Sequence, residues 1–274
     1  MSVTRSPSAS PPRRTRPRRN KPAVIIERPS ATRGIVHAGW LDSRHTFSFG
    51  HYHDPQWMGF GPLRVINEDR VAPGGGFAPH RHANMEILSY VLSGTLAHRD
   101  SASAGPSTGS GQAPSTGSGH GVIHAGELQW MSAGHGIEHS EFNPSQSEPV
   151  HFLQIWIQPD RVNAKPAYAQ QAFDPVARRG RWVVLASPDG SDGSLAIRQQ
   201  SWLRGVLLGA GEAVEMVLDP ARRYWLHVAQ GSVELDGRKL LAGDAVGFVD
   251  ESGAHRLDGS GGDVADVLWF DLPK

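Results

Sequence analysis

The stretch that decides the fold is PHRHANMEILSYVLSGTLAHRDS, residues 79–101. Its centre, Ile87 to Leu92, is apolar and β-rich, and it stops at Ser93-Gly94 before a second run begins at Thr95. The pattern is that of a strand, a glycine turn and a second strand. His80 and His82 stand just before these two strands, and on a strand their spacing of two directs both side chains to one face.

The pattern of a strand, a glycine turn and a second strand occurs twice in the chain. Residues 228–233 repeat the pattern of residues 91–96, and residues 241–244 repeat the glycine turn of residues 124–127. Other short β-rich runs, such as Phe152 to Ile157, are separated by Gly, Pro, Asn and Asp. Strands at this spacing indicate an all-β sandwich or barrel. We infer an internal duplication of one β-barrel unit.

Composition divides the chain into four expected segments. Residues 1–22 carry seven basic side chains, no acidic one and several prolines, so we expect a disordered basic tail. Residues 23–158 should form the first barrel and residues 181–274 the second. Residues 159–180 should be the linker, with a short helix around Tyr168 to Phe173. Within the first barrel, residues 101–119 contain PSTGSG twice and predict a long flexible loop.

The same composition excludes several classes of function. The chain has no cysteine, which rules out disulfides, thiolate zinc sites and thiol catalysis. No apolar stretch reaches the ~20 residues of a membrane span, and no apolar segment of a signal peptide follows the paired arginines of the tail. We therefore expect a soluble, cytoplasmic protein. Nucleic acid is expected to make no more than weak contacts with the tail.

The residues that carry chemistry are two same-face pairs. His80 and His82 form the first pair, and His139 and Glu141 form the second. Facing each other across a narrow barrel, these pairs would place three imidazoles and one carboxylate around one ion. Such a set suits Fe(II), Ni(II), Mn(II), Cu(II) or Zn(II) and leaves positions open for a substrate. The residues alone leave open whether the carboxylate is Glu141 or Glu86.

The remaining histidines and aromatics have simpler expected roles. His51 and His53 lie in a turn-rich stretch that suits a structural or rim role, and His98 is expected to make a hydrogen bond. His135 is a weaker candidate for the mouth of the site. The second half lacks a His-x-His pair, so His227 and His255 predict no second metal site. The aromatic side chains are expected mainly in the core, a few of them lining an apolar entrance; they are Phe47, Phe49, Trp57, Phe60, Trp130 and Trp156.

Several segments resemble one known family. Residues 79–101 resemble the first cupin motif as the pirin family writes it, and GELQWMSAGHGIEHSEFNPS, residues 126–145, resembles the second. RHTFSFGHYHDP (44–55), GFGPLRVINEDRV (59–71) and HFLQIWIQP (151–159) are also similar to pirin segments. The resemblance covers about residues 24–274. It implies two tandem cupin domains, which are jelly-roll-type β-barrels.

The resemblance also implies a ligand set. Carried over position by position, the pirin metal ligands fall on His80, His82, His139 and Glu141, with the metal in the first cupin and Fe(II) expected ahead of the other divalent ions. Glu86, which a generic cupin would use, then becomes a structural or supporting residue. Ser132 replaces a proline that cupins often carry there, which affects loop geometry and no ligand.

Two functions follow from the resemblance. Some bacterial pirins are similar to quercetin 2,3-dioxygenases, which implies a flavonol-like substrate, O₂ and a catalytic role for Glu141 as general base. Pirins are also described as metal-binding, redox-sensing regulators of transcription factors or metabolic enzymes, and this is the alternative. Either function is compatible with a monomer, because a bicupin packs its own two barrels together.

Overall fold

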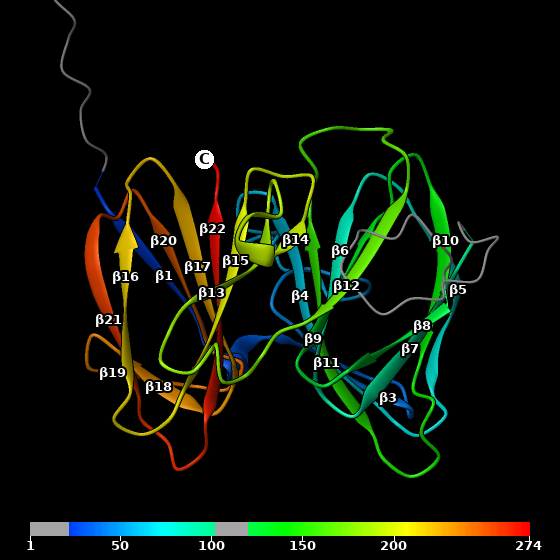
Figure 1. The fold of residues 1–274 in the computed structure, drawn as a ribbon, viewed down its shortest axis with the longest axis horizontal. Helices are drawn as coiled ribbons and strands as arrows, with labels where there is room; N and C mark the ends of the chain where they lie inside the picture. The colour runs from blue at the N-terminus through cyan, green and yellow to red at the C-terminus, as the bar shows by residue number, and fades with distance from the viewer. Residues whose placement is uncertain (1–21, 102–119) are drawn as a thin grey trace, which may run out of the picture.

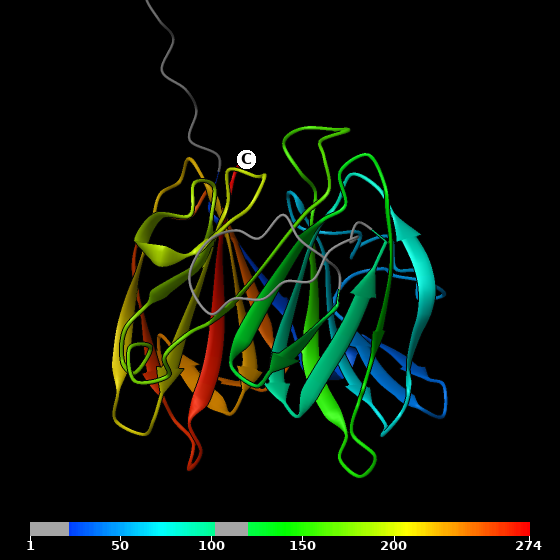
Figure 2. The same cartoon turned by 45° about the vertical axis from the view of Figure 1, so that its right-hand side comes forward.

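The computed structural model describes residues 22–101 and 120–274 and consists of two β-sandwiches side by side (Figures 1 and 2). The N-terminal sandwich pairs a seven-stranded sheet with a four-stranded sheet. The larger sheet has the order β12 (Ala167–Ala172), β9 (Glu127–Ser132), β6 (Glu86–Ser93), β11 (Val150–Ile157), β4 (Leu63–Val71), β3 (Leu41–His45) and β2 (Gly34–His37). The smaller sheet has the order β5 (Gly76–His82), β10 (Ile137–Phe142), β7 (Thr95–Asp100) and β8 (His120–His124).

The C-terminal sandwich has the same two-sheet design. Its larger sheet has the order β1 (Val24–Arg28), β20 (Ala245–Val249), β17 (Arg223–Gln230), β22 (Ala265–Leu272), β15 (Trp202–Leu208), β13 (Val183–Ser187) and β14 (Leu195–Ala196). Its smaller sheet has the order β16 (Ala213–Leu218), β21 (Gly253–Gly259), β18 (Ser232–Leu235) and β19 (Arg238–Leu241). Two 3-10 turns, η1 (Ser30–Thr32) and η2 (Ser191–Gly193), are the helical elements of the described residues.

The matching strand orders confirm the all-β, two-cupin prediction, and the turns agree in detail. Gly94 between β6 and β7 has φ 76°, and Gly231 between β17 and β18 has φ 73°. Gly126 before β9 and Gly243 before β20 have φ 83° and 85°. Left-handed backbone is accessible to glycine without steric cost, so the same residue type recurs at equivalent turns of the two halves. The basic tail and the loop predicted over residues 101–119 lie outside the described residues, apart from Ser101.

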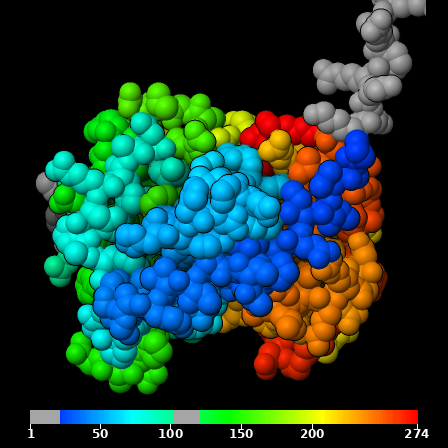
Figure 3. All heavy atoms as spheres, turned by 180° about the vertical axis from the view of Figure 1, so that it is seen from behind, coloured from blue at the N-terminus to red at the C-terminus, as the bar shows by residue number. Residues whose placement is uncertain are grey.

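The outer strand of each larger sheet comes from beyond the segment we expected. β1 is the N-terminal strand, yet it pairs with β20 of the C-terminal sandwich. β12 lies in the expected linker, yet it pairs with β9 of the N-terminal sandwich. Figure 3 shows the N-terminal segment crossing the rear of the molecule against both halves. The domain boundaries at residues 22, 158 and 180 therefore remain a prediction. Two strand pairings, β1 with β20 and β12 with β9, run across these boundaries.

The prediction of a short helix around Tyr168 to Phe173 is wrong, because residues 167–172 form β12. Tyr168 and Gln170 point into the sandwich, where they hydrogen-bond each other, and Ala167 and Ala169 pack against the opposite face. Pairing along the full length of β9 overrides the helical propensity of alanine and glutamine.

The two larger sheets pack face to face and enclose one shared apolar core. Leu153 and Ile155 of β11 meet Trp225 of β17 and Leu268 and Phe270 of β22 in the same cluster of buried side chains. A second cluster fills the inside of the C-terminal sandwich. None of the helices in the described part of the chain is long and apolar enough to span a membrane.

A buried polar triad joins the two halves within this interface. Arg178 donates to the Tyr90 hydroxyl and to Asp266 Oδ1, both at 2.6 Å, and the Tyr90 hydroxyl donates to Asp266 Oδ2. All three side chains are nearly inaccessible to solvent. A buried guanidinium and carboxylate stabilise each other only while both are present.

We expect Asp266→Ala to lower the free energy of unfolding by about 3 kcal/mol, because it leaves the Arg178 charge buried without its partner. Urea denaturation measures this loss. Asp263→Ala, at an exposed position on the preceding loop, is the matched control and should change stability little. Equal stability of the two variants would contradict a role for the triad in holding the halves together.

His227 is a second buried polar group at the interface. It lies between Trp225 and Ala229 on β17, is completely inaccessible, and has no hydrogen-bond partner for either ring nitrogen among the described residues. Burial, reinforced by Arg33, lowers the pKa of His227 to about 3. The unfolded chain binds this proton below pH ~6.5, whereas the folded protein does not until about pH 3, so stability is lost as the pH falls.

We therefore expect His227→Leu to reduce the stability lost between pH 7 and pH 5 by about 2 kcal/mol, the cost of one unmatched protonation over that interval. Urea denaturation at the two pH values gives the difference for each protein. His37→Leu, exposed on β2, is the control. A variant whose pH dependence equals that of the parent protein would show that His227 is protonated in the folded state.

Candidate metal centre

Two antiparallel strands, β5 and β10, bring the three predicted histidines together. His80 and His82 lie two residues apart on β5, and His139 of β10 pairs directly with His80. Opposite residues of an antiparallel pair project to the same face, here the inside of the N-terminal sandwich. The ring centroids lie 4.5 Å apart for His80 and His139, 4.7 Å for His80 and His82, and 4.8 Å for His82 and His139.

An irregularity in β5 shapes this pairing. His139 pairs with His80 but Glu141 pairs with Phe77, so β5 has one extra residue in this interval. Pro79 lies there, and a bulge tolerates proline because the ladder needs no N–H at that point. Gly76 then keeps the strands close, since a Cβ at that position would lie 2.5 Å from the carbonyl oxygen of Glu141.

The ligand atoms of the three histidines are available to a cation. One nitrogen from each ring lies within 4.8 Å of the others. His80 Nδ1 donates to the Ala78 carbonyl at 2.8 Å, which leaves its Nε2 free. The Nε2 atoms of His82 and His139 are buried and have no hydrogen-bond partner among the described residues. Unpaired buried imidazole nitrogens are costly unless a ligand takes them, so the triad fits a divalent transition metal.

The electrostatics keep two of these rings neutral. Burial lowers the pKa of His82 to about 4, and His80 adds to the shift. Burial also lowers the pKa of His139 to about 3, with smaller effects from His80, His82 and His98. Neutral imidazole is the form that binds metals. The Trp156 ring, edge-on to His82 at 4.8 Å, restricts the orientation of that ligand.

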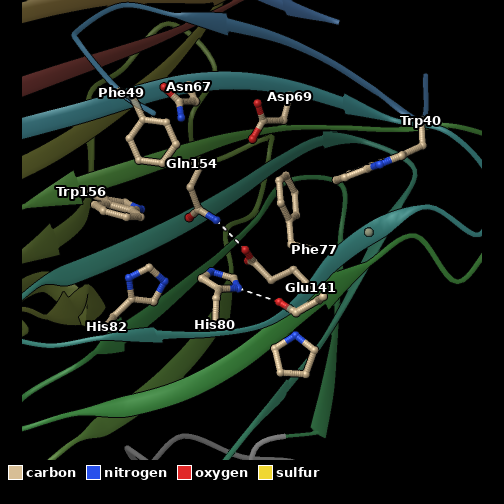
Figure 4. A pocket seen from close by; sticks show the side chains of 13 residues that line it. Trp40, Phe49, Asn67, Asp69, Phe77, His80, His82, Glu141, Gln154 and Trp156 are labelled. Atoms are coloured by element: carbon tan, nitrogen blue, oxygen red, sulfur yellow. Dashed lines mark hydrogen bonds between the residues drawn. The ribbon is translucent and has the colours of Figure 1, made fainter. Parts of the chain in front are cut away.

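Glu141 lies beside the triad but is held by other residues. Its Oε1 accepts a hydrogen bond from Ser89 Oγ at 3.0 Å and its Oε2 accepts one from Gln154 Nε2 at 2.7 Å (Figure 4). Burial, together with the nearby Asp69, raises the pKa of Glu141 to about 7. The structure does not place a Glu141 oxygen within the group formed by the three imidazole nitrogens. Its role as a ligand therefore stays a prediction.

His80, His82 and Glu141 line one cavity of about 620 Å³. Aromatic side chains form much of its wall, and Figure 4 shows them around the polar groups. The full lining consists of Trp40, Phe49, Asn67, Asp69, Gly76, Phe77, Ala78, Pro79, His80, His82, Glu141, Gln154 and Trp156. A largely aromatic cavity with a few convergent polar groups is the usual form of a small-molecule site.

Sequence reasoning missed the residues that hold Glu141. Ser89 and Gln154 belong to a polar row, in which six side chains on successive strands of the larger sheet face the inside of the N-terminal sandwich at one level. The polar row consists of His45, Asn67, Gln154, Ser89, Gln129 and Gln170, each paired in register with the next. A single polar residue inside an apolar strand, as in ILSYVL or FLQIWI, is the signal that could have indicated these positions.

Glu86 is structural, as expected. It points to the interface between the halves, where it accepts hydrogen bonds from Trp130 Nε1 at 2.7 Å, from the Ser132 hydroxyl, and from the backbone N–H of Arg198 at 2.9 Å. The chain reverses between His82 and Glu86, so their shared parity in the sequence does not give them a shared face.

The other histidines and aromatic residues that the sequence analysis named differ in whether they lie at the cavity. His98 makes the expected hydrogen bond, 3.0 Å from its Nε2 to the Tyr168 hydroxyl. His51, His53 and His135 are exposed and line no part of the cavity. Phe49 and Trp156 line the cavity, whereas the other four predicted aromatics pack in or against the interface core: Phe47, Phe60, Trp57 and Trp130.

We expect His82→Ala to weaken Ni(II) binding by at least about 100-fold, because it removes one of three converging nitrogen ligands. Isothermal titration calorimetry on metal-free protein measures the change. His51→Ala, which removes an exposed imidazole outside the cavity, is the control. Equal affinities for the two variants would place the metal elsewhere in the chain.

Comparisons with known proteins agree with this site. The Pirin family model matches residues 28–157, and the model of the quercetinase C-terminal cupin domain matches residues 184–272. Quercetin 2,3-dioxygenase of Escherichia coli K12 is 43% identical over 251 residues, which cover 91% of this chain and 99% of that protein.

Solved structures show the same relationship. The bacterial pirin YhhW from Escherichia coli, in complex with nickel(II), aligns with a TM-score of 0.80 at 40% identity, covering 91% of this chain and 99% of that one. Quercetin 2,3-dioxygenase from Acinetobacter baumannii, at 18% identity and a TM-score of 0.68, shares the fold over 90% of this chain and 86% of that one. With its two cupins and its histidine triad, the chain belongs to the pirin family.

Proposed function

We propose that the protein is a metal-dependent dioxygenase that cleaves flavonols such as quercetin with O₂, with His80, His82, His139 and Glu141 as metal ligands and Fe(II) as the metal. One observation carries the proposal. A single cavity holds unpaired imidazole nitrogens, a buried carboxyl group and aromatic walls. The names of the quercetin dioxygenases among its relatives, and the nickel(II) bound to one of them, support the same assignment.

The chemistry divides between the metal and the chain. A divalent metal at the triad would supply Lewis acidity to a bound flavonol oxygen. Glu141 acts as the general base that removes the proton of the 3-hydroxyl group, because its carboxylate lines the same cavity as His80 and His82. Ser89 and Gln154 donate hydrogen bonds to that carboxylate and fix its position.

The cavity wall contributes flat apolar surface. Trp40 and Phe77 form an edge-to-face pair at 5.0 Å, and Phe49 and Trp156 form another at 5.2 Å. These rings can pack against an aromatic substrate.

The test is turnover by protein reconstituted without oxygen with Fe(II), Ni(II), Mn(II) or Cu(II) and then mixed with quercetin in air. We expect loss of the flavonol absorbance with release of carbon monoxide. His139→Ala should abolish turnover, and Glu141→Gln should lower kcat by about 100-fold or more. Glu138→Gln, on the same strand but half-exposed and paired with Arg81, is the control.

Turnover that survives both substitutions, or that survives chelation, would rule out this mechanism. Intact metal binding without turnover of any flavonol would favour the alternative, a non-enzymatic metal-binding regulator with a protein partner.

A further inference from the structure

Asp69 is a buried carboxyl group that the proposed reaction does not use. It lies on β4 with its side chain 4% exposed, and it lines the same cavity as His80 and His82. Ser43 Oγ donates to its Oδ1, and the described residues provide no hydrogen bond to its second oxygen and no ion pair. The oxygen without a partner is open to the cavity, where a ligand can donate a hydrogen bond to it.

The neighbouring residue shows what a purely structural carboxylate looks like on this strand. Glu68 faces the opposite side of β4, where Arg33 lies at 2.6 Å, Arg70 at 2.8 Å and His151 at 3.0 Å. These partners hold the pKa of Glu68 well below its usual range. No basic side chain of the described residues forms an ion pair with Asp69, and burial, together with the nearby Glu68, raises the pKa of Asp69 to about 7. The two adjacent acids therefore have opposite environments.

Asp69 lies across the cavity from the histidines. β4 belongs to the larger sheet and β5 to the smaller one, and the sheets of a sandwich pack ~10 Å apart. Figure 4 shows Asn67, Asp69 and Gln154 as a polar strip between the Trp40–Phe77 and Phe49–Trp156 pairs, facing His80 and His82. A ligand that binds at the histidines inside this cavity therefore has this strip on the wall that the larger sheet provides.

We propose that Asp69 is a specificity-determining residue that accepts a hydrogen bond from a second phenolic hydroxyl group of the substrate, other than the group that reaches the three histidines. The inference rests on the proposed function and deepens it, because it selects polyhydroxylated flavonols over those that carry the reacting 3-hydroxyl group alone. A site that leaves a buried acceptor unpaired discriminates against ligands lacking the matching hydroxyl.

The alternative role for Asp69 is structural, as the partner of Ser43. Asp69→Asn separates the two roles. The asparagine carbonyl still accepts the Ser43 hydrogen bond, but an amide NH₂ replaces the second carboxyl oxygen and cannot accept a hydrogen bond. Asp69→Ala, which removes both oxygens, is a second variant that makes the same prediction should the amide rotate or disturb packing.

The experiment compares the binding of quercetin and 3-hydroxyflavone to Ni(II)-loaded protein without oxygen, measured by quenching of tryptophan fluorescence. We expect the parent protein to prefer quercetin. Asp69→Asn should weaken quercetin binding by about tenfold and change 3-hydroxyflavone binding by less than about twofold. Asp42→Asn on β3, where Asp42 pairs with Arg44 at the surface, is the matched control. Nickel content and thermal midpoint, measured on every variant, verify that site and fold are retained.

Equal weakening for both flavonols, or no change for either, would overturn the assignment of Asp69. Turnover in air, measured separately, tests the proposed dioxygenase function. Turnover without an Asp69-dependent preference refutes the role of Asp69 alone, and the preference without turnover refutes the dioxygenase alone. If the metal-loaded parent protein binds neither flavonol, both are wrong.

Discussion

The antiparallel register between β5 and β10 is the constraint on which the rest of the site depends. It sets His139 opposite His80 and, through the extra residue around Pro79, sets Glu141 opposite Phe77. Side chains alternate between faces along a strand, so a slip of one residue would turn the imidazoles of one strand away from those of the other. The close approach at Gly76 and the pairing of β10 with β7 along its other edge stabilise this register from both sides. The metal site is therefore a property of strand pairing and not of one flexible loop.

A polar layer inside an apolar sandwich distinguishes the two halves. In the N-terminal half, Ser89 lies between Ile87 and Val91, which belong to separate apolar clusters above and below the polar row. In the C-terminal half the same backbone encloses one continuous apolar cluster, and Met216 stands opposite His255 where His80 stands opposite His139. Burying polar groups costs free energy unless they are paired, so a duplicated barrel retains such a layer where it has a ligand to hold. The C-terminal half supports the N-terminal half through the shared interface.

Local patterns allowed the all-β fold, the duplication and the histidine triad to be predicted from the sequence. The alternation of polar and apolar residues and the glycine turns can be recognised within a few residues of sequence. The His-x-His spacing places both side chains on one face of a strand. The local sequence does not determine which strand an edge strand pairs with, because Val24 to Arg28 has the same residue pattern whichever sheet it joins. The significance of Ser89 and Gln154 was hidden for the same reason, since it arises only when β6, β10 and β11 are in register. Tyr168 to Ala172 misled because its propensity favours helix and its tertiary pairing does not.

The exchange of outer strands has a consequence for how the chain is made. Because Val24 pairs with Val249, about 225 residues are synthesised between β1 and its partner strand. At typical translation rates this corresponds to roughly 10–45 s in which β1, with two adjacent isoleucines, has no sheet to join. Completion of β12 can close the edge of the N-terminal sandwich much earlier, since Ala167 pairs with Ser132. The metal-binding half can thus mature during synthesis while β1 waits for β20, a long interval in which an apolar segment is open to chaperones or to a neighbouring chain.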